Sequence, residues 1–446
     1  MKRVANRLLI FWAVLQLLAF SAPAQQQTPI AKEGSSVTSD KAAEVRQQTF
    51  EIVWKTVNEK HFDPNFNGVD WKAVHEKYAP LVAATKTDNE LYPILSNMLK
   101  ELKESHFAII PPSADKGEEN ASKPGDAGVD GDLGMDVRAI GNQIVVTQVL
   151  PKSTAEKAGL KPGFIIDAVD DKPLNEMFKR VEERHEHPQL AKLLLARGAL
   201  AQLEGPVGST VKVHYIDGNG DSHDVNVKRQ PQRGEPAKFG NLPIEYVEFD
   251  AHKLKDNIGY IQFNIFLMPT LEPFKSAMKE FKDSPGVIID LRGNPGGLGT
   301  LSSAMSREFF KEQTSLGTMK MRNGNQNFVV FANPNAYQGT VVIITDEGSA
   351  STSEVMAGGL QELKRAIIVG QTSAGAVLPS YIEKLPNGAV LQFAIADYKT
   401  PKGVLLEGVG VHPDYEVPLT RASLLAGHDA ALEKAIAVIE EMKNKK

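Results

Sequence analysis

The chain of 446 residues contains no cysteine at all. This absence excludes disulfide bonds, a thiolate nucleophile, cysteine-based zinc sites and a lipid anchor on an N-terminal cysteine. Packing alone must therefore stabilise the fold, which the hydrophobic cores of two or three domains can do.

Clusters of lysine and arginine are also lacking, and the formal net charge is −5. Three of the basic residues lie in the first 24 positions, which carry no acid, so the rest of the chain is more acidic still. Binding to a phosphate backbone requires a basic face. We therefore expect no nucleic-acid partner.

Only one long apolar run occurs, at residues 8–20, and it follows Lys2, Arg3 and Arg7. Its 13 residues fall short of the roughly 20 that a membrane-spanning helix needs. Ala22-Pro23-Ala24 then supplies the small-x-small pattern of a signal-peptidase site. We predict a signal peptide over 1–24, cleaved after Ala24, and export to the periplasm or the medium. An uncleaved N-terminal anchor is the alternative.

Apolar periodicity and composition divide the next part of the chain. Residues 25–40 are rich in Gln, Ser and Thr and predict a flexible leader. Apolar stripes at helical spacing predict an N-terminal helical domain over 41–110. Residues 111–130, rich in Pro, Gly, Lys and Glu, predict a linker. Short strand patterns then predict a β domain over 131–229, with a polar helical insertion at 176–204.

Strand patterns alternate with helical patterns over the last part of the chain, 230–446. This alternation is typical of an α/β layered domain. The expected strands are 258–263, 287–290, 341–345, 367–370 and 390–396, and the expected helices are 271–282, 301–310 and 351–363.

A serine-rich segment, Gly348-Ser349-Ala350-Ser351-Thr352-Ser353-Glu354, lies between a predicted strand and a predicted helix. One interpretation is a capping box of Ser351 and Glu354. The other is a nucleophile at a helix N-terminus, where the next amide faces a developing oxyanion. The segment is not the Gly-x-Ser-x-Gly elbow, for which 370–375 has one residue too many. From these residues alone both interpretations stay open.

A second unusual string runs from Gly286 to Gly297, Gly-Val-Ile-Ile-Asp-Leu-Arg-Gly-Asn-Pro-Gly-Gly. It reads as a buried strand that ends in a glycine-rich turn, whose free amides suit an anion. The string resembles the hallmark of the tail-specific (C-terminal-processing) serine protease family. The segment 348–354 resembles that family's nucleophile segment, 153–163 its PDZ domain, and 407–414 its C-terminal signature.

This resemblance implies a crotonase/ClpP-like α/β catalytic core, an N-terminal helical domain and an inserted PDZ-like domain. It implies Ser351 as the nucleophile, with the amides of Gly297 and Thr352 as the oxyanion hole. Asp290 and Arg292 would hold the strand and turn in shape.

The inserted domain would bind a peptide strand along an exposed sheet edge. Leu133-Gly134-Met135 resembles the carboxylate-binding loop of a PDZ domain. Whether the domain selects C-termini stays open, because the insertion at 176–204 is atypical.

One departure from the family decides the expected mechanism. The Ser/Lys branch carries a lysine where this chain has Ala376. The chain instead resembles the tricorn-core-like branch, which uses a histidine preceded by a serine, here Ser105-His106, and a glutamate, here Glu407. The resemblance implies His106 as general base and Glu407 as its orienting partner through Ser105. An ordinary histidine pKa of about 6.5 suits that task.

The remaining histidines offer weaker candidates. His412, inside the C-terminal motif, is an alternative base. His185 and His187 stand two apart and face different sides of a helix, so we expect neither a metal site nor a cofactor. The leading hypothesis is a serine endopeptidase acting on unfolded or tail-exposed polypeptides. The alternative is a non-catalytic, PDZ-type peptide-binding pseudoenzyme; a small-substrate esterase is disfavoured by the PDZ-like segment.

Overall fold

A computed structural model describes residues 35–112, 130–182, 187–238, 240–241 and 244–445. The predicted signal peptide and most of the linker at 111–130 lie outside these residues. Of the predicted leader, residues 35–40 are described, and they form the start of helix α1. Residues 1–42 and 43–446 are separate units, and the description below concerns the second. Within the described part of the chain, no helix is both long and apolar enough to cross a membrane.

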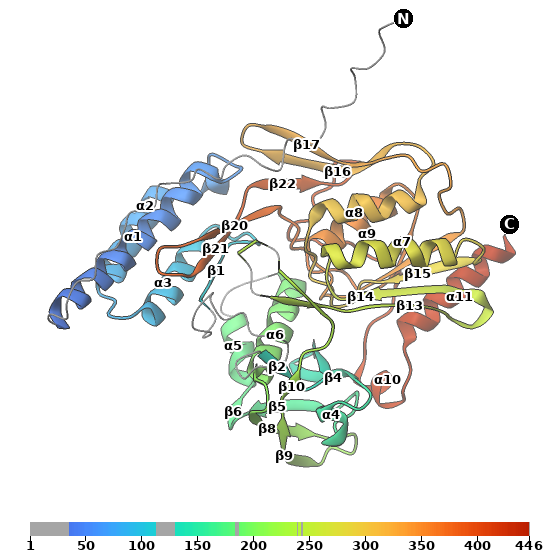
Figure 1. Ribbon diagram of the computed structural model, residues 1–446, viewed down its shortest axis with the longest axis horizontal. Helices are drawn as coiled ribbons and strands as arrows, with labels where there is room; N and C mark the ends of the chain where they lie inside the picture. Colours follow the sequence, from blue (N-terminus) through green and yellow to red (C-terminus); the bar gives the residue numbers. More distant parts are fainter. Residues whose placement is uncertain (1–34, 113–129, 183–186, 239, 242–243, 446) are drawn as a thin grey trace, which may run out of the picture. The chain divides into compact units, whose positions relative to one another are not determined.

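Three helices come first along the chain, as their apolar stripes predict: α1 (Ser35–Lys60), α2 (Trp71–Ala83) and α3 (Asp88–Lys100). Thr87 caps α3 by accepting a hydrogen bond from the Glu90 amide at 3.3 Å. The helices pack on a small antiparallel sheet of β1 (Ala108–Ile110), β21 (Val390–Ala394) and β20 (Ser380–Lys384), as Figure 1 shows. The segment after α3 is thereby tied to a hairpin from the far end of the chain.

An antiparallel sheet with the strand order β3-β4-β5-β8-β9 follows, and β6 pairs with β5. Helix α6 packs its buried residues Leu195, Ala199 and Leu203 into the core of this sheet. The predicted insertion therefore contains a helix that belongs to the domain core. The strands are β3 (Met135–Ile140), β4 (Gln143–Val149), β5 (Ile165–Val169), β6 (Lys172–Pro173), β8 (Thr210–Ile216) and β9 (Ser222–Lys228), and the helices are α4 (Thr154–Lys157), α5 (Asn175–Glu182) and α6 (Pro188–Leu203).

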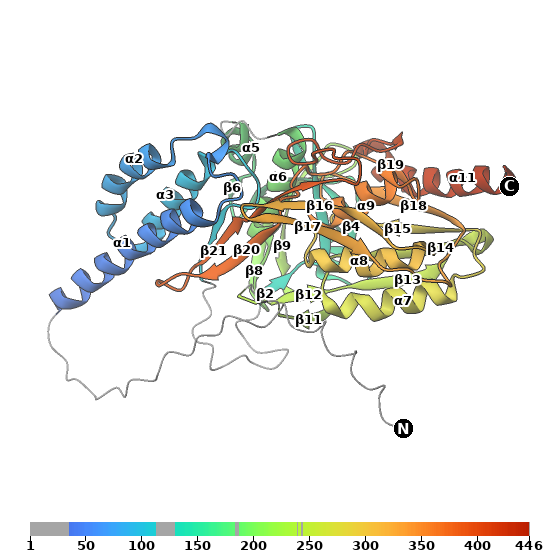
Figure 2. The ribbon, with the colours of Figure 1, turned by 90° about the horizontal axis from the view of Figure 1, so that it is seen from above.

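The predicted α/β domain is built on a six-stranded sheet with the order β13-β14-β15-β18-β19-β23, parallel except at β13. Alternate side chains of its buried strands face two cores. Helices α7, α8 and α9 cover one face and α11 covers the other (Figure 2). The elements are β13 (Phe249–Lys253), β14 (Gly259–Phe263), α7 (Leu271–Glu280), β15 (Gly286–Asp290), α8 (Gly299–Ser306), β18 (Thr340–Thr345), α9 (Thr352–Glu362), β19 (Ile367–Gly370), β23 (Tyr415–Glu416) and α11 (Ala430–Asn444).

Two expectations need correction. The single strand expected at 390–396 is two strands in different sheets, β21 and β22 (Ala396–Lys399). The chain leaves β21 where the Ile395 amide donates a hydrogen bond to the Pro379 carbonyl at 2.9 Å. The helix expected at 301–310 begins earlier and ends in a 3-10 turn at Arg307–Phe309.

The sequence patterns carried no sign of several further elements. Besides β9, β13, β20, β23 and α11, they include β2 (Asp130–Asp132), β7 (Gly205–Pro206), β10 (Gln230–Pro231), β11 (Glu235–Ala237), β12 (Glu245–Val247), β16 (Thr314–Met321), β17 (Gly324–Val330), β22 (Ala396–Lys399) and α10 (Arg421–Leu425).

Candidate active site

Ser351 stands between β18 and α9, at the N-cap of the helix. Its backbone has φ 54° and ψ −115°, a conformation that a residue with a side chain rarely adopts. The Ser351 amide donates to the carbonyl of Ala376 at 2.8 Å. Such strain persists only where the surroundings over-determine it, and it clusters at functional sites.

Glu354 supplies much of that constraint. Ser351 and Glu354 form a capping box, in which the buried carboxylate accepts a hydrogen bond from the Ser351 amide at 3.0 Å. The same carboxylate accepts from the Ser373 hydroxyl at 2.6 Å and from the amides of Gly375 and Ala376 at 2.8 and 3.0 Å. Burial raises the pKa of Glu354 to about 7, although these hydrogen bonds oppose the rise. The capping box predicted as an alternative to catalysis is thus present, and it fixes the serine turn to the 373–376 segment.

The glycine-rich turn after β15 lies directly against this serine. A Cβ on Gly296, whose φ is +99°, would come within 2.7 Å of the Ser351 Cβ, so only glycine fits. The Thr352 hydroxyl donates to the Gly297 carbonyl at 2.9 Å. The two residues predicted to form the oxyanion hole, Gly297 and Thr352, are therefore held on bonded neighbouring segments.

His106 lies in the turn between α3 and β1, with φ +61°. Its Nδ1 is 2.7 Å from the Ser105 Oγ, and that oxygen is 3.0 Å from a carboxylate oxygen of Glu407. The Ser105 amide donates to the other Glu407 oxygen at 2.8 Å. Burial raises the pKa of Glu407 and lowers the pKa of His106 to about 4.

The serine turn and the Ser105–Glu407 pair are bonded to two consecutive residues, Ala376 and Val377. Ala376 accepts from the Ser351 amide, and the Val377 amide donates to Glu407 at 2.9 Å. Residues that are 302 positions apart, Ser105 and Glu407, are thereby joined to the segment that holds the serine turn. The structure brings Ser351, Ser105-His106 and Glu407 to one region.

Comparison with known proteins indicates the family of this chain. Residues 257–417 match the model of peptidase family S41, and residues 42–100 match the tricorn protease C1 domain. The chain therefore carries a peptidase family S41 domain over residues 257–417. It is a serine-type peptidase, as its relatives are.

Several relatives, and one of the similar solved structures, carry processing-protease names. The carboxyl-terminal-processing protease of Synechocystis sp. is 27% identical over 369 residues, which are 81% of this chain and 78% of that protein. The photosystem II D1 C-terminal processing protease has a similar fold, with a TM-score of 0.57, 23% identity, and coverage of 86% of this chain and 98% of that one. Mature CPAF complexed with lactacystin gives a TM-score of 0.63 at 12% identity, with 91% and 100% covered.

Ala376, at the position where the Ser/Lys branch has its lysine, is buried in this S41 peptidase. Ala376 is 5% exposed and clusters with Ala350 and Ala374. Leu190 and Leu193 of α6 pack against this cluster. Helix α6 thus contacts both the antiparallel domain and the wall beside the serine.

The loop predicted to bind a terminal carboxylate, Leu133-Gly134-Met135, already forms hydrogen bonds with other residues of the peptidase. The Gly134 amide donates to the Asp132 carboxylate at 2.9 Å, and Leu133 accepts from the Ala155 amide at 2.9 Å. Met135 begins β3 and pairs with Val149. A carboxylate ligand would have to displace Asp132 from this loop, so PDZ-type capture stays a prediction.

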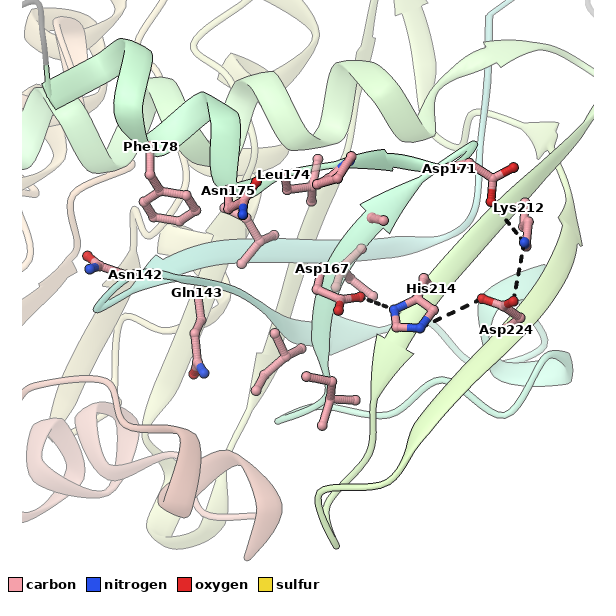
Figure 3. A pocket seen from close by; sticks show the side chains of 16 residues that line it. Asn142, Gln143, Asp167, Asp171, Leu174, Asn175, Phe178, Lys212, His214 and Asp224 are labelled. Carbon is pink, nitrogen blue, oxygen red and sulfur yellow. Dashed lines mark hydrogen bonds and ion pairs between the residues drawn. The ribbon is translucent and has the colours of Figure 1, made fainter.

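A cavity of about 510 Å³ lies elsewhere in the peptidase, over β4, β5 and β8 beside α5. Figure 3 shows His214 between Asp167 and Asp224, with Lys212 bridging Asp224 and Asp171. None of the predicted catalytic residues lines it. The cavity is therefore separate from the Ser351 region.

The other histidine candidates contribute less to this site. His412 Nδ1 lies 3.2 Å from the Thr372 Oγ1, on an exposed surface. His185 lies outside the described residues, and His187 precedes α6. The described ranges hold no group of three or more His, Asp or Glu side chains placed to bind a metal. The Ser-x-x-Glu spacing predicts the capping box of Ser351 and Glu354, but it carries no sign that Glu354 also binds Ser373, Gly375 and Ala376.

Proposed function

We propose that this S41 peptidase is an exported endopeptidase that hydrolyses peptide bonds in unfolded or tail-exposed proteins through an acyl-enzyme at Ser351. The observation that carries the proposal is the hydrogen-bond chain from His106 through Ser105 to Glu407. The carboxyl-terminal-processing names of its relatives support the substrate class. The basic, apolar and small-residue pattern of residues 1–24 supports export.

The hydrogen-bond chain selects one tautomer of His106. An ionised Glu407 can only accept, so the Ser105 hydroxyl donates to it and its oxygen is left to accept from His106. His106 Nδ1 therefore carries the hydrogen at the 2.7 Å contact, and Nε2 keeps its lone pair. Ser105 and Glu407 act here as positioning residues, and Nε2 is the proton acceptor.

The reaction proceeds in two steps, acylation of Ser351 and hydrolysis of the acyl-enzyme. His106 Nε2 takes the Ser351 proton while Oγ bonds the scissile carbonyl carbon, and the negative oxygen is held by the amides of Gly297 and Thr352. The C–N bond then breaks, and the leaving amine receives the proton from His106. Water next attacks the ester with the same base, which releases the carboxylic product and restores the Ser351 hydroxyl.

Substitution of the two catalytic residues tests the proposal. Ser351→Ala and His106→Ala should each abolish cleavage of an unfolded protein substrate, and both should leave the thermal transition nearly unchanged. A fluorophosphonate probe should label the native protein and not Ser351→Ala. His412→Ala is the matched control, and it should retain full activity because His412 stands outside the hydrogen-bond chain.

Normal turnover by either catalytic variant would refute the assignment. Loss of activity in His412→Ala, with activity kept in His106→Ala, would transfer the role of base to His412. Absence of any labelling and any turnover in the native protein would instead favour the non-catalytic peptide-binding alternative.

A further inference from the structure

The two residues that flank the Ser105-His106 pair both contact the buried ring of His61. Ser105 and His106 lie between Glu104 and Phe107, and the His61 side chain touches both of these outer residues. The His61 side chain is fully buried, and the Glu104 side chain is only 6% exposed. The Phe66 and Phe107 rings, which contact His61, pack against the core of the helical part of the chain.

The contact with Glu104 is a hydrogen bond. His61 Nε2 lies 2.7 Å from a Glu104 carboxylate oxygen. Because an ionised carboxylate can only accept, Nε2 carries the hydrogen and donates it. The other Glu104 oxygen accepts from the Asn67 side-chain amide, which comes from the loop after α1. Glu104 is thus fixed from two sides.

The contact with Phe107 is a stacking contact. The His61 and Phe107 rings are nearly parallel, at 14°, with centroids 5.5 Å apart. Phe62 stacks on His61 as well, with centroids 4.6 Å apart. The ring of His61 therefore fixes the residue before Ser105 and the residue after His106.

The turn needs such support, because its backbone is strained. Lys103 and His106 both have positive φ, at 55° and 61°. Side-chain-bearing residues hold this conformation only when neighbouring contacts impose it. The contacts of His61 supply that constraint on both flanks of the Ser105-His106 pair.

We propose that His61 is a positioning residue of the peptidase reaction, which presents the His106 imidazole to Ser351 by fixing Glu104 and Phe107. The inference rests on the proposed role of His106 as base. His61 itself touches neither substrate nor nucleophile in this assignment. Its effect is on the rate of the chemical step and not on substrate binding.

Three variants of the full chain test this role. His61→Phe keeps an aromatic ring but removes the donor to Glu104, and we expect kcat to fall about 10²-fold with KM nearly unchanged, as a small misplacement of a catalytic group does. His61→Gln keeps a donor at a similar position and should recover most of that loss. Phe107→Leu removes the stacking and leaves the hydrogen bond, so a smaller fall in kcat is expected.

A second histidine pair supplies the matched control. His75 bonds Glu51 at 3.0 Å and contacts the Phe50 and Trp54 rings, in the same helical part of the chain. His75→Phe should therefore reduce stability while kcat stays at the native value. Denaturant unfolding of all variants separates the stability effect from the kinetic one.

The outcomes separate this inference from the proposed function. Native kcat in both His61→Phe and Phe107→Leu, with an inactive His106→Ala, overturns the positioning role alone. An equal fall of kcat in His75→Phe also overturns it, because the effect would then follow general destabilisation. Should His61→Phe fail to fold, Phe107→Leu and His61→Gln decide the matter by their kcat. An active His106→Ala would instead overturn the proposed function itself.

Discussion

The Ser351 amide donates to the Ala376 carbonyl at 2.8 Å, while the Ala376 amide donates to Glu354 at 3.0 Å. Ala376, which stands where a dyad lysine would be, therefore supports the serine turn through its backbone. Its amide and carbonyl hold the serine turn, and the next amide, that of Val377, holds Glu407. The same short segment serves both the nucleophile and the network of its proposed base.

Ala376→Lys should lower stability and should not supply a new base. Position 376 is 5% exposed among alanines and leucines, so the longer chain overpacks the cluster and buries a charge, at a cost of about 2 kcal/mol or more. Urea unfolding measures the loss, and the exposed Ala422→Lys serves as the control, with a change within about 0.5 kcal/mol. Activity of the double variant Ala376→Lys, His106→Ala would contradict this view.

Ser105→Ala should slow the reaction while leaving the fold intact. Without the hydroxyl, His106 Nδ1–H loses its acceptor, and Glu407 no longer orients the ring. We expect a fall of about 10–100-fold, the size found for the hydrogen-bond partners that orient metal-bound histidines. Steady-state kcat tests this, and Ser105→Thr, which keeps the hydroxyl, should recover activity. A native kcat in Ser105→Ala would show that the relay is dispensable.

The acid limb of kcat/KM should lie well below the ordinary histidine range. Burial lowers the pKa of His106 to about 4, so the ring stays neutral, and able to accept a proton, down to that pH. We expect nearly full kcat/KM at pH 5.5 and a decline near pH 4. An acid limb centred at 6.5 or above would contradict this expectation.

The same shift has a consequence for stability. In the unfolded chain His106 binds a proton below about pH 6.5, while in the folded chain it does so only below about pH 4. Its contribution to stability is therefore complete above pH 6.5 and is lost as the pH falls through about 4. The free energy of unfolding of His106→Phe should depend less steeply on pH in this window than that of the native chain.

Glu354→Gln should destabilise the protein although it changes a single atom. All four partners of the carboxylate donate hydrogen bonds, so the amide group of glutamine would oppose two of them. Buried donors left unpaired cost about 1–3 kcal/mol each. Denaturant unfolding should show a loss of about 2 kcal/mol or more, against little change for Glu440→Gln on the exposed surface of α11. Equal stabilities of the two variants would disprove the network's importance.

Local patterns in the sequence predicted much of this molecule. The apolar stripes of α1, α2 and α3 and the buried strands β15 and β18 fell where their periodicities indicated, because each is encoded within a dozen residues. The serine turn was equally visible, since a strand, a Ser-x-x-Glu pattern and a helix follow one another. The split of 390–396 into β21 and β22 was not, because a continuous apolar run carries no sign of a change of sheet.

The sequence by itself carried the resemblance to the tail-specific serine proteases, the alanine at 376 and the Ser105-His106 pair. The family resemblance implied that Glu407 acts through Ser105, and the structure contains that contact. Only the tertiary structure decided that α6 belongs to a domain core and that His61 contacts both flanks of the Ser105-His106 pair. These are contacts between segments far apart in the chain. Their formation depends on how whole elements pack, such as β1 on β21, and no local periodicity encodes that.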